Sequence, residues 1–266
     1  MTLKLNMTLK LDWHENHFSD FADANLEQVI AVLPVAAIEQ HGPHLPLGTD
    51  TFIMEGYLER VKARLPLSGN VVFLPIQTIG QSREHNDFVG TLTLSTETAL
   101  QTWLELGANV ANAGIKKLVI INSHGGNSSI IDLVARELRI QYAMLAVIAS
   151  WSRFGYPDGL FSPQEIMHGI HGGDIETSLM LAFRPDLVRC DKMANFIPNT
   201  LQMQHDFKQL NAARPAGFGW MAQDIHPTGA MGDASIASAE KGEIAAAFGA
   251  KAFLELLDDV KKFNFD

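Results

Sequence analysis

The first group of residues that could do chemistry consists of Glu39, His41 and Asp50. All three follow the apolar run of residues 29–35. Residues two apart on an extended segment point the same way, so Glu39 and His41 can reach one point. Asp50 returns after a loop that contains two prolines and two glycines. Two carboxylates and an imidazole suit Zn²⁺, Mn²⁺ or Fe²⁺, and a carboxylate can bridge a metal pair. The structural alternative makes Asp50 a helix cap and the other two exposed loop residues.

A second motif, residues 122–127 (NSHGGN), puts His124 at the end of another buried run. Two glycines follow His124, so the backbone there can approach a metal closely. The glycines could instead form a phosphate-binding turn at a helix N-terminus. Their spacing matches neither the P-loop nor the dinucleotide-binding fingerprint, so a metal ligand is the favoured interpretation.

A third motif, residues 168–178 (HGIHGGDIETS), contains His171 and Glu176 on either side of a Gly-Gly turn. Glu176 is predicted to be a metal ligand or to handle protons, and His171 to contact substrate or act as a general acid or base. The alternative is that acidic residues in a first helical turn only complement the helix dipole.

A polar loop over residues 80–91 contains Ser82, Glu84 and His85. Its expected place is beside the metal site, where substrate binding is the favoured role. A Ser/His nucleophile pair is disfavoured, because Ser82 lacks the strand–elbow–helix setting that such a nucleophile requires.

The elements that must position these residues alternate along the chain. Buried runs predict strands over residues 29–35, 70–76, 117–122 and 144–150. Helices are expected over 50–65, 95–112, from 127 to about 141, from 162, and over 173–183 and 235–263, the last with a break at Gly249. Residues 194–232 are expected to be irregular. The alternation predicts an α/β fold, a single domain with a central, mostly parallel sheet flanked by helices. Ligands bind such sheets beyond the carboxyl ends of the strands, where the polar motifs fall.

The composition narrows the class of protein. A length of 266 residues with 47% apolar residues suits one large globular domain. The net charge of −10 disfavours nucleic acid as a partner. The single cysteine excludes an internal disulfide. The sequence has no apolar run long enough for a membrane span and no secretion signal, so a cytoplasmic protein with no membrane partner is expected.

Four of these motifs together resemble the creatininase family. They are residues 39–50, residues 84–91, residues 123–127 and residues 171–178, and residues 229–242 are similar to the family's closing motif. The resemblance covers roughly residues 25 to 260. It divides the chain into an N-terminal segment, residues 1–24, and a creatininase-like metal hydrolase domain, residues 25–266.

The resemblance implies one or two divalent metal ions (Zn, Mn or Fe), a small-molecule amide substrate and a homohexamer. It implies hydrolysis of a cyclic amide, formamide or related C–N bond through a metal-bound hydroxide. Glu39, Asp50 and His124 would hold one metal, and His41 with the bridging Asp50 would hold the second. Ser82 and His171 would face the substrate. The residues themselves, rather than the resemblance, predict His171 and Glu176 as the catalytic groups.

Two departures from the family pattern make creatinine itself a doubtful substrate. Creatinine-hydrolysing members carry a glutamate ligand where this sequence has Gly126, and a tryptophan where this sequence has none near Met167. We hypothesise that Glu176 supplies the missing ligand. Two alternatives stay open at this point: a deformylase or peptidase acting on a biosynthetic intermediate, and a non-catalytic metal-binding protein that kept the fold.

Overall fold

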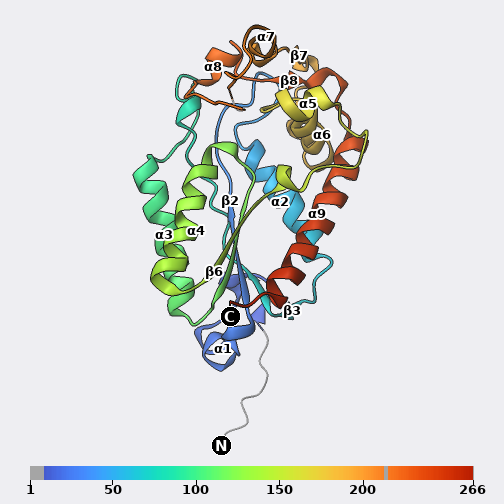
Figure 1. The fold of residues 1–266 in the computed structure, drawn as a ribbon. Helices are drawn as coiled ribbons and strands as arrows, with labels where there is room; N and C mark the ends of the chain where they lie inside the picture. The colour runs from blue at the N-terminus through green and yellow to red at the C-terminus, as the bar shows by residue number, and fades with distance from the viewer. Residues whose placement is uncertain (1–8, 213–214, 266) are drawn as a thin grey trace, which may run out of the picture.

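The centre of the protein is a four-stranded sheet. The computed structural model describes residues 9–212 and 215–265 (Figure 1). The strands are β2 (Ile30–Val35), β4 (Val71–Phe73), β5 (Lys117–Asn122) and β6 (Leu145–Ser150), in the order β4-β2-β5-β6, and every pair is parallel. Val35, Asn122 and Ser150 are in register, so three strands end at the same edge. The predicted α/β fold with a parallel sheet is confirmed.

Helices cover both faces of this sheet (Figure 1). On one face lie α3 (Thr96–Asn112) and α4 (Ser128–Tyr142). On the other lie α2 (Thr49–Lys62), α6 (Asp174–Phe183) and α9 (Ala239–Lys262). Successive side chains of β2 serve the two faces in turn: Val32 packs with the α2 and α9 core, and Ala31 and Leu33 pack with the α3 and α4 core. This alternation explains why the strand reads as one continuous apolar run.

A cap of short elements lies over the carboxyl edge of the sheet (Figure 1). It contains α5 (Pro163–His168), α7 (Asn199–Asp206), α8 (Ala222–Ile225), β7 (Asn195–Phe196) and β8 (Gly232–Asp233). The expectation that residues 194–232 are irregular is therefore wrong in part. The reason is tertiary: Nδ1 of His168 lies 3.0 Å from the Thr200 hydroxyl, and Nε2 donates to Oε1 of Gln204 at 2.8 Å, which fixes α7 against α5.

Two other elements differ from their predicted bounds. The helix α9 continues through Gly249, where a break was expected. The glycine there serves close packing, because a Cβ at that position would stand 2.6 Å from the ring of Tyr57. The strand β4 stops at Phe73, shortly before Pro75, which has no N–H to donate to a ladder.

The remaining elements are small. A two-residue strand β1 (Leu9–Lys10) pairs with β3 (Ser68–Gly69), and α1 spans Phe18–Asp23. Residues 1–8 of the predicted N-terminal segment lie outside the described residues. Among the described residues, no helix combines the length and apolar character that a membrane span requires. Short 3₁₀ helices occupy Trp13–Glu15, Leu26–Gln28, Arg83–His85, Gly125–Asn127, Trp151–Phe154, Pro185–Leu187, Cys190–Lys192 and Ala234–Ile236.

Candidate metal centre

The polar residues singled out in the sequence gather just beyond the carboxyl edge of the sheet. Glu39 and His41 lie in the loop after β2, and His124 follows β5 directly. Asp50 and Glu176 stand in the first turns of α2 and α6. All but Glu176 are at least 95% buried. Parallel strands and the N-termini of the following helices meet at this edge, which explains the convergence of residues so far apart in the chain.

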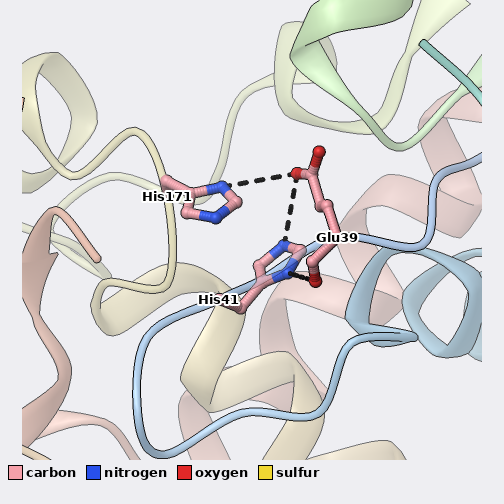
Figure 2. A group of neighbouring side chains, drawn as sticks. All are labelled: Glu39, His41 and His171. Carbon is pink, nitrogen blue, oxygen red and sulfur yellow. Dashed lines mark hydrogen bonds and ion pairs between the residues drawn. The ribbon is translucent and has the colours of Figure 1, made fainter. Parts of the chain in front are cut away.

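His41 points one ring nitrogen at three carboxylates. Its Nδ1 donates to the carbonyl oxygen of Glu39 at 3.1 Å, which fixes the ring (Figure 2). Its Nε2 then lies 3.6 Å from Oδ1 of Asp50, 3.8 Å from Oε2 of Glu176 and 3.9 Å from Oε1 of Glu39. These distances leave room for an ion between the imidazole and the carboxylates.

His124 approaches the same carboxylates from the β5 side. Its Nδ1 lies 3.0 Å from Oε1 of Glu39 and 3.4 Å from Oδ2 of Asp50. Its backbone is held by the Asn122 side chain, which accepts from the His124 N–H and donates to the His124 carbonyl. Asp50 therefore stands between His41 and His124, as a bridging carboxylate would.

His171 completes the group from the cap (Figure 2). Its Nε2 donates to the carbonyl oxygen of Gln40 at 2.5 Å, and its Nδ1 lies 3.6 Å from Oε1 of Glu39. Its ring stacks on those of His41 and His85, with centroids 4.0 and 4.4 Å apart. The side chain of Gln40 donates to the carbonyl oxygen of Gly229 at 3.0 Å, so it links the β2 loop to the cap.

Several buried polar atoms of this cluster have no hydrogen-bond partner. They are both carboxylate oxygens of Glu39, Nε2 of His41 and Oδ2 of Asp50. A buried polar atom without a partner costs about 1–3 kcal/mol, and more when it is charged, so such atoms are rare in folded proteins. Oxygen and imidazole donors that converge on one region with so few hydrogen-bond partners fit one or two divalent cations. Within the part of the chain that the structure describes, three donor groups are compact enough to hold an ion: Glu39–His41–His171, Glu39–Glu84–His124 and His41–Asp50–Glu176.

The same crowding shifts the pKa values of the cluster. Burial lowers the pKa of His41, but the carboxylates of Asp50, Glu176 and Glu39 outweigh burial and raise it to about 9. Burial raises the pKa of Glu176 to about 7, although His41 opposes that shift. Burial, together with His41 and His85, holds the pKa of His171 well below its ordinary value. His41 therefore takes up a proton that a cation would displace, and His171 stays neutral.

The chain matches the family model described as creatinine amidohydrolase over residues 14–257. The protein belongs to the creatininase family. The creatinine amidohydrolase of Pseudomonas putida is 33% identical over 234 residues, which cover 81% of this chain and 83% of that protein. A mycofactocin precursor peptide peptidase of Mycobacterium ulcerans is 29% identical, covering 86% of this chain and 81% of that protein.

More distant relatives extend the range of named activities in this family. A 3-dehydro-scyllo-inosose hydrolase of Thermotoga maritima is 27% identical over 244 residues, covering 86% of this chain and 75% of that protein.

A solved structure named creatininase Mn superposes with a TM-score of 0.77 at 26% identity, covering 96% of this chain and all of that one. Another is a creatininase mutant of Zn-Zn type, with a TM-score of 0.74 at 27% identity. The family resemblance predicted from the motifs is confirmed, and the chain is a hydrolase of this family.

A cavity of about 310 Å³ opens beside the cluster, and His124 and Glu176 form part of its wall. Trp151, Tyr156 and Ile170 supply other parts of the wall. It adjoins a larger groove of about 1890 Å³ between α5 and α7, because Ser152, Arg153 and Ile166 line both.

The structure brings all the predicted site residues into one region, together with three neighbours to which the sequence alone gave no individual role. Ser82 is fully buried, with its hydroxyl 3.3 Å from Nε2 of His124. The additional residues are Glu84, His85 and Gln40. His85 places Nε2 3.7 Å from Oε2 of Glu39 and approaches the Gln40 amide nitrogen through Nδ1. The signal for all three was their place in a family motif, since Gln40 lies in residues 39–50 and the other two lie in residues 84–91.

Proposed function

We propose that this protein is a metal-dependent amidohydrolase that cleaves a cyclic amide, a formamide or a related C–N bond. One observation carries the proposal: the buried oxygens of Glu39 and Asp50 and the Nε2 of His41 converge without hydrogen-bond partners. Retaining these groups has no packing benefit, because burying them unpaired is costly. A divalent cation held there would supply a Lewis acid and lower the pKa of water toward neutrality.

The chain's own residues supply the proton chemistry of the proposed reaction. In the metal-free protein burial raises the pKa of Glu176 to about 7, so this carboxylate exchanges a proton near neutral pH; unless it is itself a ligand of the cation, it is placed to serve as a general acid or base. His171 is neutral, and its Nε2 proton is committed to the Gln40 carbonyl, so its Nδ1 is the atom that can accept a proton or contact a substrate. Glu176 also accepts the Gly172 N–H at 2.6 Å, which fixes its carboxylate.

The proposal is tested by counting metals per chain in the wild type and in Glu176→Ala. Two metals in the wild type and about one in the variant would support Glu176 as the ligand that replaces the family glutamate at Gly126. Two metals in both would restrict Glu176 to proton handling. Glu243→Ala is the matched control, because Glu243 is exposed on α9 and pairs with Arg60 outside the site. A wild type that takes up no metal after reconstitution would refute the hydrolase mechanism and favour a non-catalytic protein.

A second candidate is a peptidase or deformylase that acts on a larger biosynthetic intermediate. The observation that favours it is the groove of about 1890 Å³, which continues outward from the cavity beside His124 and Glu176. A compact ring such as creatinine would leave this groove empty. A panel of lactams, formamides and short peptides separates the candidates, since cleavage confined to peptides would favour the second and turnover of small rings or formamides the first.

The family resemblance also leads us to propose a homohexamer. Light scattering coupled to size-exclusion chromatography measures the mass in solution, and a mass near six times 29.2 kDa is expected. A monomeric mass would contradict this part of the proposal.

A further inference from the structure

The two ring nitrogens of His124 face different surroundings. Nδ1 faces the metal-binding carboxylates of Glu39 and Asp50, at 3.0 and 3.4 Å. Nε2 faces the loop after β4. There it donates to the carbonyl oxygen of Gln81 at 2.8 Å and lies 3.5 Å from Oε1 of Glu84. Because a carbonyl can only accept, Nε2 carries a hydrogen, and Nδ1 is the atom left for a cation.

Position 126 is built around the Glu84 carboxylate. A Cβ on Gly126 would stand 2.4 Å from Oε1 of Glu84, 2.4 Å from Nε2 of His124 and 2.7 Å from the Gln81 carbonyl. Three contacts this short exclude any side chain unless the loop moves. The volume beside Gly126 is therefore occupied by a carboxylate from another part of the chain.

The loop that carries Glu84 is itself held in place. The Ser82 N–H donates to the Thr93 hydroxyl at 2.7 Å, and the His85 N–H donates to the Ser82 carbonyl at 3.0 Å in the 3₁₀ helix Arg83–His85. The side chain of Glu84 is 18% exposed, so its charge is only partly screened by water.

We propose that Glu84 is a positioning residue of the metal centre, which acts through His124. Its carboxylate, with the Gln81 carbonyl, holds the Nε2–H form of His124 and makes Nδ1 a stronger ligand. Carboxylates behind metal-binding histidines orient the ring and raise its basicity, and removing them typically costs 10–100-fold in metal affinity. Gly126 is a glycine because the Glu84 carboxylate needs that space.

The test is a titration of metal-free protein with Co²⁺, followed by visible absorption, on wild type, Glu84→Ala and Glu84→Gln. We expect Glu84→Ala to weaken binding at the His124 site by about 10–100-fold. Glu84→Gln should lose less Co²⁺ affinity than Glu84→Ala, because its amide keeps an oxygen of the same size near Nε2 of His124. The absorption bands at saturation should match the wild type, because His124, Glu39 and Asp50 remain the ligands. Asp87→Asn is the matched control, since Asp87 is exposed on the same loop and pairs with Gln223.

A double-mutant cycle separates positioning from a general structural role. If Glu84 acts through His124, Glu84→Ala should weaken Co²⁺ binding no further in a His124→Ala background. An effect of equal size in both backgrounds would overturn the proposal. So would unchanged Co²⁺ affinity in Glu84→Ala, or a change of the saturated bands, which would make Glu84 a direct ligand.

This inference rests on the metal centre of the proposed function, and the two fail in different ways. A wild-type chain that binds no Co²⁺ refutes the proposed function. A wild-type chain that binds Co²⁺ with an affinity that Glu84→Ala leaves unchanged refutes only the role of Glu84.

Discussion

Both ends of the strands in the central sheet contain charged side chains, but only at one end do these side chains find hydrogen-bond partners within the chain. At the amino edge, Lys117 opens β5 and its Nζ donates to the carbonyls of Val260, Lys261 and Phe263, at 2.8, 2.9 and 2.8 Å. These carbonyls lie in the last turn of α9 and at its C-cap, Phe263. Carbonyls at the C-terminal end of a helix have no N–H partner within the helix. At the carboxyl edge, Glu39 and Asp50 keep buried oxygens with no hydrogen-bond partner.

The difference shows at which edge the polar groups find their hydrogen-bond partners within the chain itself. At the amino edge, Lys117 and the carbonyls near the end of α9 satisfy one another, so this contact contributes to stability without a ligand. The carboxyl edge leaves several acceptors buried around one point, and that arrangement is stable only with protons or cations to neutralise it. Charge alone does not distinguish the two edges, because both contain ionised groups. The distinction is whether those groups find their partners within the chain.

The largest expected effect comes from Asp50→Ala at the carboxyl edge. Asp50 stands between His41 and His124, so both proposed ion positions lose a ligand. Losing the electrostatic contribution of the cations should lower kcat/KM by about 10³-fold or more, which corresponds to about 4 kcal/mol. The measurement is metal content together with turnover of whichever amide the wild type hydrolyses. Full metal occupancy in this variant would contradict the bridging position of Asp50.

Metal removal should expose the proton dependence of the carboxyl edge. In metal-free protein the pKa of His41 is about 9, above its ordinary value of 6.5, because nearby carboxylates outweigh burial. Its stabilising contribution is therefore complete below pH 6.5 and is lost as the pH rises through about 9. Burial raises the pKa of Glu176 from 4.5 to about 7, and the contribution of that group is lost between those values.

Metal-free protein should therefore lose stability between about pH 4.5 and 9, through Glu176 in the lower part of this range and through His41 above about pH 6.5. Bound metal displaces these protons, so the stabilisation by metal should grow over the same range. At 100 times Kd a ligand adds about 2.7 kcal/mol. Thermal unfolding with and without Zn²⁺ at pH 6.5, 7.5 and 8.5 measures both trends. A difference in Tm that shrinks as the pH rises would contradict this account of the site.

The smallest expected effect comes from Lys117→Met at the amino edge. Methionine keeps most of the apolar stem and removes the three charged hydrogen bonds to α9. We expect a loss of about 1–3 kcal/mol in the free energy of unfolding. Urea unfolding measures this loss. Metal content and kcat/KM should stay at wild-type values, which elemental analysis and a turnover assay would check. A loss of metal would show that the two edges are coupled and would contradict their independence.

The sequence by itself determined the central strands, the helices that flank them, and the edge of the sheet where the polar motifs gather. The strand over residues 117–122 has the predicted bounds, and Ser95 caps α3 by accepting the Thr98 N–H. Glu39 and His124 follow strand ends, and their place at one edge needed only the rule for parallel sheets. These features were predictable because hydrophobic periodicity, caps and strand ends are encoded within a few neighbouring residues.

Only the tertiary structure decided which atoms meet. It turned Nδ1 of His124 toward Glu39 and Nε2 toward Glu84, and it set Glu176 beside His41. It also formed α7, where a predicted irregular segment finds hydrogen bonds to His168. Such pairings depend on how separate loops and helix ends approach over the sheet. Local sequence carries little information about them, because each partner's geometry is fixed by the packing of the elements that carry it.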